Sequence, residues 1–501
     1  MNPVLDKLEA TVKRMPEKDA VEDLDSHLTY RQLQTLARRA GSRLAEEIRP
    51  GEPVVLFLEK SCRALALLYG VLYGGGFYVF IDPLQPQERM RRILARLDAG
   101  ICVTTAENLD RLQAAGFTGQ ILLADELLSE QTAPDLILLQ QRRGEMTAES
   151  LLYGIFTSGS TGEPKGVVVS AGAAADFIGH FTDEMGIRPQ DRVGNQAPFD
   201  FDVSVKDIFS CAFTGATLVL IPRTYFAVPR SLLDYLQERK ITVLIWAVSA
   251  LCMISAFHGF DYLLPQKLRM VMFCGEAMPV RQLQIWQDAL PDVQYVNLYG
   301  PTEITCNCTY YRLPAGLWKG RTIPIGQPFP GRKVFLLDEN GQIITEPECE
   351  GQIAVSGESI SAGYYHDEER TRQSFVTLDG QRTYLTGDYA CFGYDGLLYF
   401  HGRRDSQIKH MGHRIELGEV ERAMMEPAAV SRACCLFDSE HRRIWGFYEG
   451  DIAETDLRMK LKAILPGYMI PGRIFRIRQF RLNKNGKIDR MDLRRKAGIA
   501  V

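Results

Sequence analysis

The chain has 501 residues, of which 46% are hydrophobic and 24% are charged. This balance is ordinary for globular enzymes and excludes a mainly disordered, collagen-like or coiled-coil protein. The formal net charge of -4 gives no indication of a protein that coats nucleic acid, and we expect no nucleic-acid partner. At about 150 residues per domain, the length predicts three to four structural units.

The charge is distributed unevenly along the chain. Residues 406–501 contain 19 Lys and Arg against 12 Asp and Glu, a net charge of +7, which leaves -11 for the first 405 residues. A basic segment attached to an acidic body favours an anionic ligand or partner near that segment. A solvated charged surface is the alternative interpretation.

Two further features concern the cellular compartment. The N-terminal segment lacks the apolar stretch of a secretory signal, and the most apolar run, residues 64–81, contains three consecutive glycines. We interpret this run as a buried helix followed by a buried strand, because such glycines do not favour a membrane span. The 11 cysteines are scattered without zinc-ligand spacing. We therefore expect reduced thiols, a cytoplasmic location and no insertion into membranes.

Up to about residue 320, short β-branched runs alternate with helical periods. Strands are expected at 53–58, 216–221 and 241–245, and helices at 61–73 and 230–240. Alternation of this kind predicts βαβ units that form mostly parallel sheets covered by helices.

A different pattern follows residue 320. Short strands are expected at 332–337, 342–345, 351–356 and 397–401, separated by turns. They predict a β-rich subdomain over about 321–404, which completes an N-terminal core of residues 1–404. The polar run 401–407 is a candidate boundary. Residues 405–501, with helices at 417–425 and near 456–464, have the size of one small α+β domain.

The sharpest motif covers residues 153–167. An apolar strand leads into a loop rich in Ser, Thr and Gly that ends in Lys165. Glycine lets the backbone approach a polyanion, amides and hydroxyls donate hydrogen bonds, and lysine supplies charge. The loop differs from the P-loop of NTPases, because Pro164 and Gly166 stand where that motif needs Gly and Ser or Thr. We interpret it as a phosphate-binding loop and not as a plain surface turn.

This loop resembles the signature of the adenylate-forming superfamily, which comprises acyl-CoA synthetases, luciferases and the adenylation domains of nonribosomal peptide synthesis. Six further stretches resemble motifs of that family in the same order, at 28–33, 74–83, 297–303, 384–388, 402–407 and 485–490. The resemblance implies an α/β fold. A large N-terminal domain of stacked, mostly parallel sheets with helices and a β-rich subdomain precedes a small mobile α+β C-terminal domain.

The resemblance also implies a set of ATP-binding residues and Mg2+ as the accompanying ion. Tyr299 offers a π-face to adenine, Asp388 can accept the ribose hydroxyls, and Glu303 is a carboxylate ligand for Mg2+. Thr302, Glu303 and Lys487 are the expected catalytic residues. The full ATP-binding set is Thr157, Ser158, Gly159, Ser160, Thr161, Gly162, Lys165, Gly275, Glu276, Ala277, Asn297, Tyr299, Gly300, Thr302, Asp388, Arg403 and Lys487.

The superfamily reaction has two halves. A carboxylate and ATP first form an acyl-adenylate and pyrophosphate, and a thiol then displaces AMP. Lys487 is expected to bridge the carboxylate and the α-phosphate, because both reactants are anions. The C-terminal domain is expected to swing about Asp405 between the halves, after which Gly412 lines a pantetheine tunnel.

The stretch 197–205 indicates an amino-acid substrate. Asp202 matches the carboxylate that amino-acid-activating members pair with the substrate α-ammonium, and fatty-acyl or aryl-CoA ligases are not expected to keep it. Asp200 and Asp207 are expected to face solvent or to cap helices. By motif alignment, the substrate pocket comprises Asp202, Val203, Lys206, Ile245, Met272, Cys274, Leu298, Cys306 and Asn307.

Within the superfamily, the chain is most similar to the stand-alone D-alanine–D-alanyl carrier protein ligases. The phrase 196–202 and the stretch 272–276 carry this similarity, and the end of the chain 11 residues after Arg490 suggests a separate carrier protein. Cys274 then fills a wall that favours the D-enantiomer, or is a small apolar wall residue without a chiral role.

Lys206 departs from the D-alanine enzymes, which carry an apolar residue at this position. We expect it to turn toward Asp200 or Asp207, because a buried unpaired lysine is costly. If it faces the pocket, the substrate carries an acidic or polar side chain.

Three alternatives to D-alanine activation remain open. They are a stand-alone adenylation enzyme for another amino acid in a peptide natural-product pathway, an acyl- or aryl-CoA ligase, and an inactive scaffold that binds a carrier protein.

Overall fold

The computed structural model describes residues 2–131, 133–158, 163–403, 407–481 and 488–499. Its largest sheet has nine strands, and the five neighbouring pairs from β13 through β10 to β1 are all parallel. In spatial order these strands are β15 (Gln327–Pro328), β14 (Thr309–Arg312), β13 (Gln294–Tyr299), β12 (Met270–Cys274), β11 (Val243–Ala247), β9 (Arg192–Asn195), β10 (Thr217–Leu220), β1 (Asp19–Glu22) and β2 (His27–Thr29).

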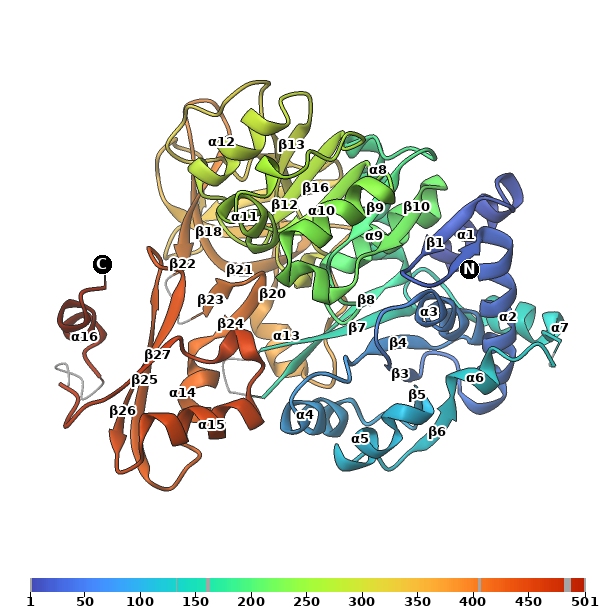
Figure 1. Cartoon of the computed structure of the whole chain (residues 1–501), viewed down its shortest axis with the longest axis horizontal. Coiled ribbons are helices and arrows are strands. Elements are labelled where there is room, and N and C mark those ends of the chain that lie inside the picture. The colour runs from blue at the N-terminus through green and yellow to red at the C-terminus, as the bar shows by residue number, and fades with distance from the viewer. Residues whose placement is uncertain (1, 132, 159–162, 404–406, 482–487, 500–501) are drawn as a thin grey trace.

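A second sheet has seven strands, seen at the lower right of Figure 1. Its pairs from β7 to β6 are parallel, and β8 and β19 add antiparallel pairs at one edge. In spatial order the strands are β19 (Gly363–Tyr364), β8 (Lys165–Ser170), β7 (Leu151–Thr157), β4 (Phe77–Phe80), β3 (Pro53–Phe57), β5 (Ile101–Thr104) and β6 (Gln120–Leu123).

Helices cover both faces of the two sheets. Val54 and Leu56 of β3 belong to the main core between the sheets, whereas Val55 and Phe57 face a second cluster on the outer side. This alternation follows from the two-residue period of a strand. The core between the sheets contains side chains of α1 (Pro3–Arg14), α2 (Tyr30–Glu47), α3 (Cys62–Gly74), α8 (Ala171–Met185) and α9 (Val203–Thr214).

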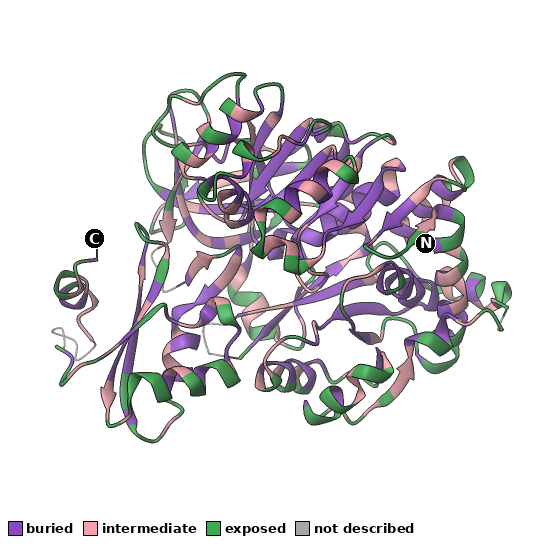
Figure 2. Cartoon of the chain, viewed as in Figure 1, coloured by how far each residue is buried: buried purple, intermediate pink, exposed green. Residues whose placement is uncertain are grey.

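The remaining helices of the first 404 residues are α4 (Gln87–Leu97), α5 (Leu109–Ala114), α6 (Ala124–Leu127), α7 (Leu136–Glu145), α10 (Pro229–Glu238), α11 (Val248–Ala256), α12 (Val280–Ala289) and α13 (Glu368–Ser374). The outer clusters contain side chains of α4, α5, α10, α11 and α12, whereas α6 and α7 contribute Leu127 and Leu139 to the main core. Figure 2 shows that the strands are mostly buried and that exposed residues lie on helices and loops. Short 3-10 turns are η1 (Ala106–Asn108), η2 (Arg223–Ala227), η3 (Gly259–Asp261) and η4 (Thr302–Ile304).

The apolar run 64–81 forms the buried helix α3 and the buried strand β4, as predicted. Each glycine of its triplet has a steric reason. A Cβ on Gly74 would lie 3.1 Å from the carbonyl oxygen of Gly41, and one on Gly76 would lie 2.9 Å from that of Glu52. Gly75 ends the helix with φ of +90°, a conformation that favours glycine.

A third, six-stranded sheet follows residue 330. It contains β17 (Ile343–Ile344), β16 (Arg332–Leu337), β18 (Gly351–Gly357), β21 (Gln381–Phe392) and β20 (Phe375–Leu378), with β22 (Leu398–Arg403) paired to β21. Strand β16 has the predicted bounds, and β11 begins two residues later than predicted.

The C-terminal part has its own sheets and cores. It comprises the hairpin β23 (Gln407–His410) and β24 (His413–Glu416), the sheet β25 (Val430–Asp438), β26 (Arg443–Gly450) and β27 (Arg473–Arg476), the helices α14 (Leu417–Met425), α15 (Glu454–Ile464) and α16 (Arg490–Ala497), and η5 (Gly467–Met469). Its hydrophobic clusters contain only residues from Ile408 onward, whereas the main core ends at Phe400. The α/β fold expected for the two parts is thereby confirmed.

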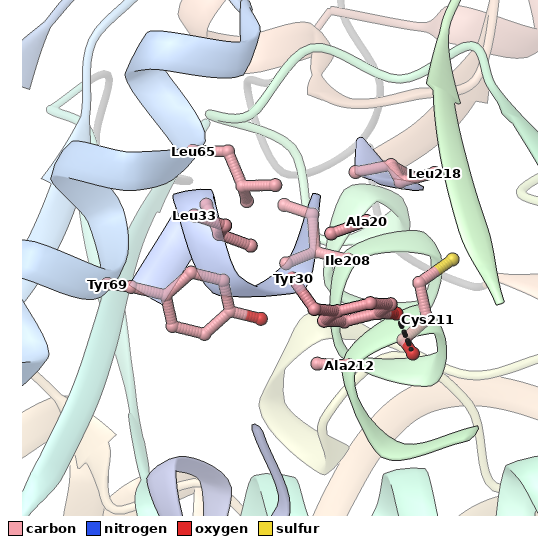
Figure 3. A pocket seen from close by; sticks show the side chains of 9 residues that line it. All are labelled: Ala20, Tyr30, Leu33, Leu65, Tyr69, Ile208, Cys211, Ala212 and Leu218. Atoms are coloured by element: carbon pink, nitrogen blue, oxygen red, sulfur yellow. Dashed lines mark hydrogen bonds between the residues drawn. The ribbon is translucent and has the colours of Figure 1, made fainter. Parts of the chain in front are cut away.

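A small cavity lies in the main core between α2, α3 and α9 (Figure 3). Its lining is apolar apart from two tyrosines, and the Tyr30 hydroxyl lies 2.7 Å from the carbonyl oxygen of Cys211. We assign this cavity to packing, because no charged group lines it. Among the described helices, none has the length and apolarity needed to cross a membrane.

The contact between α2 and α3 generates a stability prediction. A Cβ on Gly70 would lie 2.8 Å from the Cβ of Ala40, closer than two such atoms can pack. We expect Gly70→Ala to lower the free energy of unfolding by about 1–3 kcal/mol, because overpacking displaces one helix. Gly179→Ala in α8 is the control, since no atom lies within 4 Å of its added Cβ. It should raise stability by up to about 1 kcal/mol. Urea unfolding measures both, and equal effects would contradict the packing argument.

Candidate functional site

Motifs from distant parts of the sequence line a single pocket. It lies beyond the carboxyl ends of β12 and β13, where parallel α/β sheets commonly bind ligands, and the β23–β24 hairpin closes its other side. About 540 Å³ of space there is free of protein atoms, part of it open to solvent. Twelve of the predicted residues line it, namely Asp202, Val203, Lys206, Cys274, Gly275, Gly300, Thr302, Cys306, Asn307, Asp388, Arg403 and Gly412.

Asp202 stands at the N-terminus of α9 without capping the helix. Its side chain instead contacts Thr302, and only 8% of the residue is exposed. Burial raises the pKa of Asp202, and Lys206 partly opposes this shift. A buried carboxylate that serves no helix cap is suited to an ammonium group entering the pocket.

The Lys206 side chain points into the pocket and not toward Asp200 or Asp207. Its Nζ donates to Oδ1 of Asn307 at 2.6 Å and lies 3.7 Å from Sγ of Cys274. The expected outward orientation is therefore wrong, because α9 is buried and its Lys206 position faces β12 and the chain after β13.

The two neighbouring aspartates also differ from expectation. Asp207 is fully buried and accepts a hydrogen bond from Nδ2 of Asn195 at 2.7 Å. Burial raises the pKa of Asp207 to about 7. Asp200 is half-buried and accepts from Nε2 of Gln85 at 2.5 Å, and burial together with Asp82 raises its pKa to about 6. Neither is a solvated or capping residue, since both lie where α9 enters the core.

Three predicted pocket walls, Ile245, Met272 and Leu298, lie in the main core and are not among the lining residues. In the sheet, Ile245 pairs with Met272 and Ala247 with Cys274. Met272 and Cys274 share a face because they are two residues apart, so Met272 lies one step deeper. Only the last residue of β12 on this face reaches the pocket.

The phosphate-binding loop connects β7 to β8. Thr157 ends β7, and the Ser158 hydroxyl donates to the carbonyl oxygen of Arg414 at 2.5 Å. Lys165 begins β8, where Nζ lies 3.0 Å from Oε1 of Glu303. Burial, followed by Arg414, lowers the pKa of Lys165 to about 8. Predicted residues that lie outside the described part of the chain are Gly159, Ser160, Thr161, Gly162, Asp405 and Lys487.

Glu303 is completely buried among cationic and hydroxyl donors. Nη1 of Arg414 lies 2.9 and 2.8 Å from its two oxygens, and the Tyr364 hydroxyl donates to Oε1 at 2.7 Å. Burial alone would raise the pKa of Glu303, but Arg414 and Lys165 outweigh burial and hold it well below its ordinary value. The carboxylate is therefore ionised and fully engaged.

The predicted ribose and adenine residues form another cluster. Oδ2 of Asp388 accepts from the Tyr299 hydroxyl at 2.5 Å, and Oδ1 accepts from Nη1 of Arg403 at 2.6 Å. Nζ of Lys409 lies 5.1 Å from the centroid of the Tyr299 ring. Asn297 donates to the carbonyl oxygen of Pro324 and does not line the pocket.

The turn after β12 contacts the C-terminal hairpin. The Gly412 amide donates to Oε1 of Glu276 at 2.7 Å, and Arg442 forms an ion pair with the same carboxylate. Gly275 has φ of +92°, and a Cβ there would lie 3.6 Å from Cα of Gly412. Ala277 is exposed. The hairpin is thus docked against the predicted nucleotide-binding turn.

Some pocket residues escaped the sequence reasoning. Arg414, Lys409 and Gln407 line the pocket from the hairpin, and Tyr364 contacts Glu303 from β19. Arg414 lies two residues after the predicted Gly412, so its position was a usable signal. For Tyr364 nothing in the sequence indicated the contact, because β19 meets Glu303 only through sheet pairing with β8.

Comparison with known families identifies the chain. Residues 8–365 match the family model described as AMP-binding enzyme, which is more than half of the sequence. The chain belongs to the AMP-binding enzyme family. This AMP-binding enzyme is 32% identical to the L-proline–[L-prolyl-carrier protein] ligase of Streptomyces coelicolor, over 92% of this chain and 91% of the relative. It is 30% identical to the D-alanine–D-alanyl carrier protein ligase of Bacillus velezensis, over 97% and 98%.

Other relatives are much longer. The AMP-binding enzyme is 31% identical to tyrocidine synthase 2 of Brevibacillus parabrevis over 97% of this chain, but it spans only 13% of that protein. Among solved structures, holo-PA1221, an NRPS protein containing adenylation and PCP domains, matches with a TM-score of 0.83 at 25% identity, over 98% of this chain and 84% of that one. The Vibrio cholerae adenylation domain AlmE matches in fold, with a TM-score of 0.85 at 22% identity, over 99% and 98%.

The engagement of Glu303 generates a second stability prediction. We expect Glu303→Gln to lower the free energy of unfolding by about 3 kcal/mol, because Lys165 and Arg414 would stay buried without their anion. In the wild-type protein, the pKa of Glu303 is lower in the folded than in the unfolded state. Its contribution to stability is therefore fully present above the unfolded pKa of about 4.3, and it declines as the pH falls below that value. Denaturant unfolding at pH 7 and pH 3.5 should show a smaller difference from wild type at pH 3.5. The exposed Glu149→Gln is the control, and a pH-independent difference would contradict this account.

Proposed function

We propose that this protein adenylates an amino acid with ATP and then transfers the aminoacyl group to the phosphopantetheine thiol of a carrier protein. The observation that carries the proposal is the position of Asp202, whose buried carboxylate shares one pocket with Gly300, Thr302 and Asp388. The two stand-alone relatives named above are carrier protein ligases for proline and D-alanine, which supports the same chemistry here.

In the first half-reaction, an oxygen of the amino-acid carboxylate bonds to the α-phosphorus of ATP, and pyrophosphate leaves. Asp202 binds the α-ammonium and orients the carboxylate. Lys487, which lies outside the described residues, neutralises the two anions as they meet. In the second half-reaction, the thiol loses its proton, its sulfur bonds to the acyl carbon, and AMP leaves.

Glu303 fits a role as ligand for the Mg2+ that accompanies ATP, because Mg2+ commonly takes one or two carboxylates together with substrate phosphates. When bound, the ion would neutralise phosphate charge. In the described structure Arg414 and Lys165 engage both oxygens of Glu303. We infer that Arg414 withdraws from Glu303 when Mg-ATP binds.

We also propose that residues 405–501 form a lid that exchanges two faces at the pocket. The hairpin face is docked, with Gly412 against Gly275 and Glu276. The α16 end is bound elsewhere, because Arg490 pairs with Glu421 at 2.6 Å and α16 lies at the outer edge of the molecule (Figure 1). This arrangement supports the proposal that the hairpin face serves thiol transfer.

The substrate side chain and the thiol acceptor remain predictions. D-Alanine is supported by the relative from Bacillus velezensis and by Cys274 in the pocket wall. Lys206 beside Cys274 favours an amino acid with an acidic or polar side chain instead. Offering coenzyme A and a phosphopantetheinylated carrier protein to the preformed adenylate separates a CoA ligase from a carrier protein ligase.

The test of the proposed function is ATP–pyrophosphate exchange with D- and L-amino acids. We expect Asp202→Asn to lower kcat/KM for the amino acid about 100-fold, because the α-ammonium would lose a buried charge partner. The dissociation constant for ATP should change little. Asp234→Asn is the control, because Asp234 is a half-buried residue of α10 that accepts from the Tyr262 hydroxyl and does not line the pocket. Exchange that depends on no amino acid, or that is unchanged in Asp202→Asn, would overturn the proposal.

A pair of variants tests the lid. Lys487→Ala should reduce adenylation by about 100-fold or more while the preformed adenylate still reacts with the thiol. Gly412→Leu should slow the reaction of the preformed adenylate with the thiol and leave adenylation largely intact. The reason is that the φ of +81° disfavours a side chain, and an added Cβ would lie 2.8 Å from the Cβ of Ala247. Single-turnover assays of each half-reaction measure both. If each variant lost both half-reactions to the same extent, the proposal that two faces of residues 405–501 alternate at the pocket would be contradicted.

A further inference from the structure

Lys206 is a buried cation in the pocket, one helical turn after Asp202. The residue is 1% exposed, and the side chains that it contacts, Asn307 and Cys274, are both uncharged. Burial raises the pKa of the Cys274 thiol, which keeps it protonated. Among the described residues, no carboxylate oxygen lies within ion-pair distance of Nζ. A buried ammonium without a contacting anion is costly, so natural proteins place one where an anion binds.

The two nearest aspartates are committed to other partners. Asp202 influences Lys206 through space, but under the proposed function its carboxylate takes the α-ammonium of the substrate. Asp207 accepts from Asn195, whose Oδ1 and carbonyl oxygen in turn accept from Nζ of Lys60 at 3.0 and 3.2 Å. Asp207 is therefore linked to Lys60 through Asn195, and it influences Lys206 through space without lying within ion-pair distance of it.

Counting charges in the occupied pocket distinguishes classes of side chain. At the amino-acid end of the pocket, apart from the phosphate and from Asp388, Arg403, Lys409 and Arg414, a neutral amino acid would place its α-ammonium and Lys206 beside a single carboxylate, Asp202. One positive charge would then stay uncompensated at that end. A basic side chain would add another positive charge. A side-chain carboxylate balances the pair, and an ammonium has three donors, of which Asn307 and Cys274 use two.

Lys206 lines the pocket together with residues that have small side chains or none. Cys274, Gly275 and Gly300 line the same pocket, and Asn307 holds the ammonium from the opposite side. We propose that Lys206, positioned by Asn307, binds the side-chain carboxylate of an acidic amino acid of the aspartate or glutamate type. This inference rests on the proposed function and specifies its substrate class.

The experiment is ATP–pyrophosphate exchange with the full chain and a panel of aspartate, glutamate, asparagine, glutamine and alanine, each as both enantiomers. We expect one acidic amino acid to exceed its own amide and alanine by about 100-fold or more in kcat/KM. Lys206→Met should remove this preference, lowering kcat/KM for the acid about 100-fold while exchange with the amide or alanine stays equal or rises. Lys333→Met, an exposed lysine on β16, is the matched control and should keep the wild-type profile.

The outcomes separate the two proposals. Wild-type protein that exchanges with no amino acid would overturn the proposed function. Wild-type protein that prefers alanine or an amide, with Lys206→Met retaining that preference, would overturn the acidic substrate and leave the proposed function standing. Thermal unfolding and ATP binding verify that Lys206→Met is folded. If that variant does not fold, the wild-type preference between each acid and its amide decides the question.

Discussion

The arrangement of the site depends on the interactions of one buried carboxylate, that of Glu303. It follows β13 of the nine-stranded sheet and accepts from Lys165 and Tyr364 of the seven-stranded sheet. It also binds Arg414 of the C-terminal hairpin. One anion thus joins both large sheets and the C-terminal hairpin. Since it is fully buried, removing it leaves two cations unpaired.

Charge pairing also organises the substrate end of the pocket. Asp202 and Lys206 lie one turn apart on α9, with Asn307 and Cys274 around the lysine. Both charges are desolvated, so each favours a ligand group of opposite sign far more than it would in water. Under the proposed function, the ammonium of an amino acid would pair with Asp202, and the proposed acidic side chain would pair with Lys206. Recognition would then follow from two charges at a fixed spacing.

The orientation of Lys206 and the environment of Asp207 were mistaken in the sequence analysis for the same reason. The expectation placed Lys206 and Asp207 outside the core because buried charges are costly, whereas the structure buries every residue from Val203 to Ala212. Likewise, motif alignment alone does not indicate which residue of a strand reaches the pocket and which residue, two positions earlier on the same face, lies in the core. Met272 and Cys274 show this difference, because it depends on where the neighbouring strand ends.

The sequence by itself determined the family, the alternation of strands and helices, and most residues that line the pocket. Motif order and two- or 3.6-residue periods are local properties, and they survive without knowledge of the fold. Only the tertiary structure decided that Lys206 faces Asn307, that Arg414 occupies Glu303, and that the hairpin and not α16 lies at the pocket. These contacts join residues about a hundred positions apart or more, so they depend on sheet pairing and on docking of the C-terminal hairpin, which no local pattern encodes.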